Sequence, residues 1–173
     1  MFKENLETIA LFGGSFDPPH FGHKSVVEEA LKVLTIDKLI VVPTFLNPFK
    51  TVSHFTTKER LALTKELFES FEKVVVDNYE IEEQNPTPTA QTLRYFQKKY
   101  SVEYLIIGAD NLEHIEKWYE FEWLNSQITW VVATRKGYEI KSNKLRDIKI
   151  LEVEVDLSST QIRNKESSIY EQK

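Results

Sequence analysis

The sequence predicts an α/β protein with a doubly wound parallel sheet of five or six strands. Short apolar runs alternate with stretches of helical periodicity along the 173 residues, a pattern typical of a parallel sheet covered by helices. The informative turn residues follow the apolar runs, where the ligand-binding loops of such sheets lie. No repeat, low-complexity tract or linker divides the chain, so residues 1–173 are expected to form a single domain.

The expected strands are continuous apolar runs, as in sheets buried on both faces. They lie at residues 8–12, 38–42, 73–77, 103–107 and 128–133, and the alternating apolar and acidic run 148–155 is expected as an edge strand. Helices are expected at residues 24–34, 56–68, 89–100 and 113–124, with a polar connector at 80–88 and a short last helix from Ser158. The capping boxes Thr56-x-x-Glu59 and Ser158-x-x-Gln161 open two of these helices. Right-handed crossovers between the strands would give Rossmann-like winding.

Composition excludes several classes of protein. The hydrophobic fraction of 41% and the charged fraction of 28% are ordinary for a soluble globular protein. No apolar run has membrane-spanning length and the first residues lack a signal-peptide pattern, so we expect a cytoplasmic protein without a membrane partner. The absence of cysteine excludes disulfides, thiol catalysis and cysteine-based zinc sites. A net charge of −5 argues against a nucleic-acid partner.

The central motif is the stretch GGSFDPPHFGH, residues 13–23, between the first strand and the first helix. Gly13 and Gly14 are expected to let the backbone approach a bulky anion. His20 and His23 stand at the helix start, where free N–H groups and the helix dipole attract negative charge. Two imidazoles three residues apart can converge there on one phosphate group, with Gly22 leaving room for it. The motif therefore predicts a nucleotide site.

This stretch closely resembles the GxFDPxHxGH signature of the nucleotidylyltransferase superfamily of α/β-phosphodiesterases. Residues 157–163, LSSTQIR, resemble the second signature of that superfamily, ISSTxxR. Ser158 and Ser159 would place hydroxyl and N–H groups at a helix start. Arg163 lies on the same face as Ser159, where its guanidinium can hold triphosphate oxygens bidentately.

Other segments resemble the nicotinate-nucleotide adenylyltransferase family within this superfamily. GADNL at 108–112, followed by Trp118, is similar to the family's GADNL…W segment. TAQTL at 89–93 resembles YTxDTL, and RKGY at 135–138 resembles RPGY. A departure is Phe49, which stands in NPFK where the family commonly has the histidine of PPHK.

The resemblance implies that ATP and nicotinate mononucleotide give nicotinate adenine dinucleotide and pyrophosphate, with Mg²⁺, by direct in-line attack. The implied catalytic residues are His20, His23, Lys50 and Arg163. The implied ATP site also contains Gly13, Gly14, Ser15, Phe16, Gly22, Ser158 and Ser159, and the implied mononucleotide site contains Thr89, Asp110, Trp118 and Arg135. No His, Asp and Glu residues have metal-site spacing, so Mg²⁺ is expected to arrive with the triphosphate.

Several residues have structural alternatives. Asp17 is either a site residue or a turn carboxylate bonded to nearby N–H groups, and Trp118 stacks on the pyridine ring or packs in the core. Asp110 binds ribose or metal, or is a helix N-cap, and Arg135 binds the mononucleotide or caps a strand. We expect His54 and His114 to be ordinary surface residues.

Alternative functions are phosphopantetheine adenylyltransferase, a dual-specificity nicotinate and nicotinamide mononucleotide adenylyltransferase, and a nucleotide-binding module without turnover. The sequence leaves open whether the chain is a monomer or a homo-oligomer.

Overall fold

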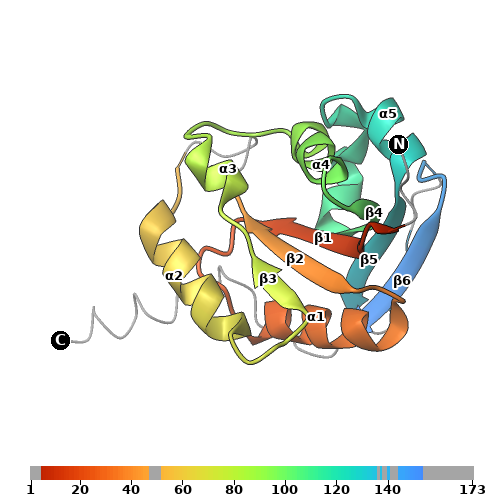
Figure 1. The fold of residues 1–173 in the computed structure, drawn as a ribbon. Helices are drawn as coiled ribbons and strands as arrows, with labels where there is room; N and C mark the ends of the chain where they lie inside the picture. Colours follow the sequence, from red (N-terminus) through yellow and green to blue (C-terminus); the bar gives the residue numbers. More distant parts are fainter. Residues whose placement is uncertain (1–4, 47–51, 136, 138–139, 141–143, 154–173) are drawn as a thin grey trace.

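The computed structural model describes residues 5–46, 52–135, 137, 140 and 144–153. Its elements, in chain order, are β1 (Thr8–Gly14), α1 (Phe21–Val33), β2 (Lys38–Pro43), α2 (Thr57–Phe68), β3 (Val74–Val76), α3 (Tyr79–Glu82), α4 (Thr89–Gln97), β4 (Ser101–Gly108), the 3₁₀ helix η2 (Ala109–Lys117), α5 (Phe121–Gln127), β5 (Thr129–Arg135) and β6 (Ile148–Val153). The six strands form one parallel sheet in the order β3-β2-β1-β4-β5-β6 (Figure 1). The predicted doubly wound sheet is therefore confirmed, and β6 is the predicted edge strand.

The strand order creates a crevice beside β1. The chain winds outward from β1 through β2 and β3, and then returns to place β4 on the other side of β1. Because the connections leave β1 and β4 in opposite directions, their carboxyl ends border the position where such sheets bind ligands. The turn at 15–20 follows β1 at this edge, since Gly14 pairs with Pro43 at the last position of β1 and β2.

Both faces of the sheet are covered by helices. Successive strand residues point to opposite faces, so Ile9 and Leu11 belong to one core cluster and Ala10 and Phe12 to the other. Helices α1 and α2 pack on the Ala10 side, whereas α4, η2 and α5 pack on the Ile9 side (Figure 1). Coverage on both faces is the physical reason that the central strands are continuously apolar.

The predicted helix at 113–124 is wrong. The chain forms η2 and α5 instead, and between them Trp118 is extended, with φ −66° and ψ 140°. Glu120 has a left-handed φ of 53° and forms an ion pair with Arg94 of α4. The break turns Trp118 toward the core, where its ring lies 6.0 Å from that of Trp130. Tertiary packing of this aromatic side chain overrides the helical pattern.

The buried face of α2 is not its apolar one. Of the apolar residues Leu61, Leu63, Leu67 and Phe68, only Phe68 is buried. In the structure the buried residues of α2 are Arg60, Thr64 and Phe68, which follow one another at i, i+4 and i+8. Thr56 caps this helix as the sequence predicts, accepting the N–H of Glu59 at 3.1 Å.

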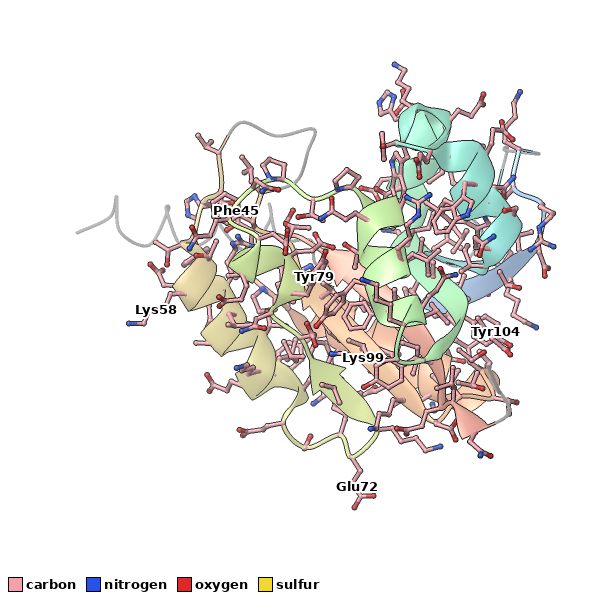
Figure 2. All side chains as sticks on the ribbon, turned by 45° about the horizontal axis from the view of Figure 1, so that its top comes forward. Phe45, Lys58, Glu72, Tyr79, Lys99 and Tyr104 are labelled. Carbon is pink, nitrogen blue, oxygen red and sulfur yellow. The ribbon has the colours of Figure 1, made fainter. Side chains whose placement is uncertain are left out.

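The expected polar connector at 80–88 is partly structured. It contains most of α3, whose Tyr79, labelled in Figure 2, stacks on Tyr95 of α4 at 3.8 Å between ring centroids. Glu80 and Thr87 are buried within the segment. The segment therefore packs against α4 and contributes polar side chains to the interior. Among the described helices, none is long and apolar enough to cross a bilayer.

Candidate active site

The turn after β1 is built on a buried phenylalanine. Phe16 has a left-handed φ of 47°, and its ring is 1% exposed. The ring lies 5.4 Å from Phe12 and 4.7 Å from His23, between centroids. A Cβ at Gly14 would stand 3.2 Å from the Phe16 ring, so glycine there accommodates this ring. Gly14 therefore has a structural role beside the expected approach of an anion, because the Phe16 ring occupies the adjacent space and contacts His23.

The two histidines lie together at the start of α1, as their spacing predicts. The helix begins at Phe21 and not at Lys24, and His20 is its N-cap. The imidazole Nδ1 of His20 accepts the N–H of Gly22 at 2.9 Å, and Nδ1 of His23 accepts the N–H of His20 at 3.1 Å. The ring centroids are 3.9 Å apart. These bonds fix both rings and leave their Nε2 atoms available.

Both imidazoles are neutral in the free protein. Burial lowers the pKa of His20 to about 4, and burial together with the nearby His20 lowers the pKa of His23 to about 3. Since each Nδ1 accepts a hydrogen bond, each neutral ring carries its proton on Nε2. At this helix start the N–H groups of His20 and Gly22 are not free, because they are bonded to imidazole nitrogens. The two Nε2–H groups are donors that the turn can offer an anion.

Asp17 joins the turn to the start of α2. Its carboxylate is 4% exposed and accepts the N–H groups of His54 and Phe55, each at 2.6 Å. This geometry favours the turn-carboxylate alternative over a substrate contact. His54 has an exposed side chain, as expected, but its main chain holds Asp17.

Arg60 holds the same turn from α2, and the sequence analysis missed it. Its guanidinium is 0% exposed and donates to the carbonyl of Ser15 from Nη1 and to the carbonyl of Phe45 from Nη2, each at 2.7 Å. Figure 2 labels Phe45 near the start of α2. Burial lowers the pKa of Arg60, and the nearby Asp17 opposes that shift. The available signal was the i, i+4 and i+8 spacing of Arg60, Thr64 and Phe68.

A cavity of about 270 Å³ lies beside this turn, at the carboxyl ends of β1 and β4. Its lining residues are Leu11, Gly13, Gly14, Val42, Thr44, Glu80, Thr87, Pro88, Thr89, Thr92, Leu105, Ile106, Ile107, Asn111, Lys117, Trp118 and Tyr119. The cavity therefore joins the glycines of the first motif to Thr89 and Trp118. Trp118 packs against Trp130, as its core alternative predicts, and it also lines the cavity. Its stacking on the pyridine ring stays a prediction.

Two predicted mononucleotide residues are absent from the cavity wall. Asp110 is exposed. Its Oδ1 lies so close to the backbone of Gly108 that a Cβ added to Gly108 would stand 2.6 Å from this oxygen. The N-cap of η2 is Gly108, so the N-cap alternative for Asp110 is wrong. Asn111 lines the cavity in its place and donates to the carbonyl of Gly108 at 3.1 Å. Arg135 is exposed at the end of β5, and His114 is exposed as expected.

Glu80 is a second functional candidate that the sequence analysis missed. Its side chain lines the cavity, the residue is 5% exposed, and its Oε2 lies 2.7 Å from the hydroxyl of Thr92, which donates to it. Burial raises the pKa of Glu80 to about 8, and the Thr92 hydrogen bond opposes the shift. A glutamate in a segment with two prolines carries no periodic signal, so only the packing of α3 on α4 reveals its position.

Comparison with known proteins decides the family. Residues 11–165 match the model of the family described as cytidylyltransferase-like. A Sulfurovum protein named "probable nicotinate-nucleotide adenylyltransferase" is 48% identical over 98% of this chain and 90% of its own length. An Aliarcobacter butzleri protein of the same name is 44% identical over 94% of this chain and 89% of its own. The chain belongs to the nicotinate-nucleotide adenylyltransferase family.

Solved structures agree with the fold of this nucleotidyltransferase. Plasmodium falciparum nicotinic acid mononucleotide adenylyltransferase in complex with APC has a TM-score of 0.74, at 20% identity over 91% of this chain and 83% of its own. The same parasite enzyme in complex with NaAD has a TM-score of 0.73. The Rossmann-like architecture is thus shared with structures that hold an adenine nucleotide or a dinucleotide.

Four predicted site residues of this adenylyltransferase lie outside the described residues: Lys50, Ser158, Ser159 and Arg163. Their roles in phosphate binding remain predictions. Within the described part of the chain, no three or more His, Asp and Glu side chains form a group that could hold a metal ion.

Proposed function

We propose that this enzyme transfers the adenylyl group of ATP to the 5′-phosphate of nicotinate mononucleotide, releasing pyrophosphate and forming nicotinate adenine dinucleotide. One observation supports this function best. A single crevice brings Gly13 and Gly14, next to the histidine turn, into the same cavity wall as Trp118 and Thr89. An ATP held at the turn would then present its α-phosphate to an acceptor held in the cavity.

In this proposal the imidazoles of His20 and His23 bind the α-phosphate. Each neutral ring donates one hydrogen bond from Nε2, and the rings are preorganised by their own Nδ1 bonds. An approaching phosphate raises the pKa of both rings, because a nearby anion favours the charged form. Lys50, Ser158, Ser159 and Arg163 are proposed to hold the β- and γ-phosphates.

The acceptor half of the site is proposed to be the cavity. Trp118 presents a ring to stack on the pyridine, while its other contact with Trp130 keeps it in place. Helix α4 begins at Thr89 without a side-chain cap, so its first N–H groups and its dipole favour the carboxylate of nicotinate. Asp110 and Arg135 are retained as contacts to the mononucleotide outside the cavity wall.

The proposed chemistry is a direct displacement. The acceptor phosphate is itself a nucleophile near neutral pH, so the reaction requires neither a covalent intermediate nor a strong base. Catalysis then consists of alignment and stabilisation of charge on the phosphates. We propose that Mg²⁺ enters bound to the triphosphate, where it offsets phosphate charge, with phosphate and water oxygens as its main ligands.

Pyrophosphate release with ATP and a panel of acceptors tests this function. We expect kcat/KM for nicotinate mononucleotide to exceed that for nicotinamide mononucleotide by at least about 100-fold, because the amide leaves donors of the site unpaired. Phosphopantetheine should give no release above background. Comparable efficiencies with the two mononucleotides would indicate a dual-specificity enzyme, and release with phosphopantetheine alone would overturn the proposal. Binding of ATP without release for any acceptor would indicate a nucleotide-binding module.

A further inference from the structure

The acceptor cavity contains a buried carboxyl group that the proposed chemistry does not use. Glu80 comes from α3, and its carboxyl group accepts a hydrogen bond from the hydroxyl of Thr92 of α4 at 2.7 Å. Thr92 is 3% exposed and lines the same cavity, as do Thr89 and Trp118. The carboxyl group thus lies in the wall of the space assigned to the acceptor.

The charged groups around Glu80 do not provide a cation that offsets the charge of its carboxylate. The walls from β1, β2 and β4 contribute Leu11, Gly13, Gly14, Val42, Thr44, Leu105, Ile106 and Ile107, none of which is ionisable. Titratable or charged groups near it are Tyr79 and Glu82 of α3, Glu83 just after α3, and Arg94 and Tyr95 of α4. From the end of η2 and just after it, Lys117 and Tyr119 line the cavity. Arg94 is paired with Glu120, and Lys117 is exposed. Burial is therefore the larger influence on Glu80, and it favours the uncharged acid.

We propose that Glu80 controls the charge of the acceptor cavity: as an uncharged acid it admits the nicotinate carboxylate of the acceptor, and as a carboxylate it repels that group. This inference rests on the proposed function, because it takes nicotinate mononucleotide as the acceptor. With the pKa of Glu80 near 8, the acid form dominates at neutral pH. Acceptor affinity should accordingly decrease as pH rises through this value, whereas ATP affinity should not.

The test measures KM for nicotinate mononucleotide and for ATP between pH 7 and pH 9. Over this range the acceptor phosphate, which loses its second proton near pH 6, is already fully charged. The range also lies below that in which lysine and tyrosine ordinarily titrate. If only the acid form of Glu80 binds the acceptor, its KM rises by about tenfold from pH 7 to pH 9. The KM for ATP should change by less than about twofold.

Two variants separate this effect from a structural role. Glu80→Gln keeps the size and a hydrogen-bonding partner for Thr92, and should remove the pH dependence of the acceptor KM. Glu82→Gln is the matched control, since Glu82 lies on the same helix, is exposed and does not line the cavity. It should keep the full rise.

Calorimetric titration with nicotinate mononucleotide supplies a readout that does not require turnover. At pH 8.5 the wild-type protein should take up roughly 0.8 proton on binding, and Glu80→Gln should take up none.

A flat acceptor KM in active wild-type enzyme, or an equal rise of the acceptor KM in Glu80→Gln, would overturn the role of Glu80. Proton-linked binding without pyrophosphate release would support Glu80 and contradict the proposed function. Absence of both binding and release would contradict both.

Discussion

Neutral imidazoles in the turn after β1 change how the proposed phosphate contacts would form. A motif with two histidines at a helix start suggests cationic partners for a triphosphate. The structure shows instead that Nδ1 of each ring is occupied by a main-chain N–H group and that burial lowers the pKa of both rings. Each ring is therefore an oriented Nε2–H donor before substrate arrives, and gains charge only when an anion raises its pKa.

The first residue-scale prediction concerns His23. His23→Ala should lower kcat by on the order of 100-fold or more, because a preorganised donor to the transferring phosphoryl group is lost. Steady-state kinetics with saturating ATP and acceptor would measure this loss. His114→Ala is the control, since that imidazole is exposed and lies outside the cavity wall, and it should retain wild-type kcat. A His23→Ala enzyme with near-normal kcat would remove His23 from the proposed mechanism.

The second residue-scale prediction concerns stability and Glu80. The pKa of Glu80 is raised from 4.5 to about 8, so its contribution to stability is complete below pH 4.5 and is lost as pH rises to about 8. Glu80→Gln does not titrate. The stability of Glu80→Gln relative to wild type should therefore be greater at pH 8 than at pH 5. We expect the difference in unfolding free energy between variant and wild type to increase by at least about 1.4 kcal/mol, the value of one pKa unit.

Urea unfolding of both proteins at pH 5 and pH 8 would measure this difference. Comparing variant with wild type at the same pH cancels the titration of His20 and His23, which has the opposite sign. An identical difference at the two pH values would show that Glu80 does not titrate with a raised pKa.

At the scale of elements, α2 positions the turn after β1. Its buried face presents a guanidinium, and the segment just before it presents two N–H groups, so the turn is held at Ser15 by Arg60 and at Asp17 by residues 54 and 55. These contacts surround Phe16, whose left-handed backbone is otherwise disfavoured for a residue with a side chain. The helix thereby contributes to the site without contacting substrate in the proposed mechanism.

The element-scale prediction follows from this arrangement. Arg60→Lys should retain little of the stability that the Arg60 hydrogen bonds contribute, because an ammonium lacks the planar fork that reaches two carbonyl groups. Arg60→Met removes the donor from two partly buried carbonyls and should lower the unfolding free energy by roughly 2 kcal/mol. In both variants KM for ATP should rise more than KM for the acceptor, since the affected turn is the proposed nucleotide site.

Chemical denaturation and separate KM measurements would check these effects. Lys65→Ala, which changes an exposed cation on the same helix, should alter neither quantity. Wild-type stability in Arg60→Met would show that the two carbonyl bonds are dispensable.

At the scale of the molecule, the cavity of the proposed ligand site lies where the two halves of the sheet meet. The turn after β1, the start of α4 and the end of η2 are far apart in sequence, yet they border one cavity. A ligand there contacts elements from both halves and should stabilise the fold as a whole.

The whole-molecule prediction is thermal stabilisation by ATP with Mg²⁺. At a ligand concentration 100 times Kd, the stabilisation is about 2.7 kcal/mol. For a chain of this size each kcal/mol raises Tm by roughly 2–4 °C, so Tm should rise by about 5–10 °C. Thermal scanning with and without ATP would measure it. Lys38→Ala is the control, because it removes an ion pair with Glu7 at the opposite end of the strands. This variant should show the same rise in Tm with ATP. A shift below about 1 °C at saturation would contradict ATP binding at this site.

The sequence alone determined the sheet, its approximate strands, a helix following the two histidines and the family. These features depend on local patterns: apolar runs mark strands buried on both faces, and a glycine-rich turn followed by two histidines defines a conformation within eleven residues. The signature turn and the loop at 108–111 could be placed at one crevice from the sequence, because parallel strands end at the same edge. Trp118 was assigned to the site only by the family resemblance.

Only the tertiary structure decided the protonation of the histidines, the position of Glu80, the role of Arg60 and the break between η2 and α5. Each depends on which distant groups surround a side chain. Burial of a charge changes its pKa, and an unpaired buried carbonyl demands a donor, whichever segment supplies it. Glu80 looks like one more surface acid in a polar stretch until α4 packs over it. Local sequence cannot encode that outcome, because desolvation is a property of the assembled fold.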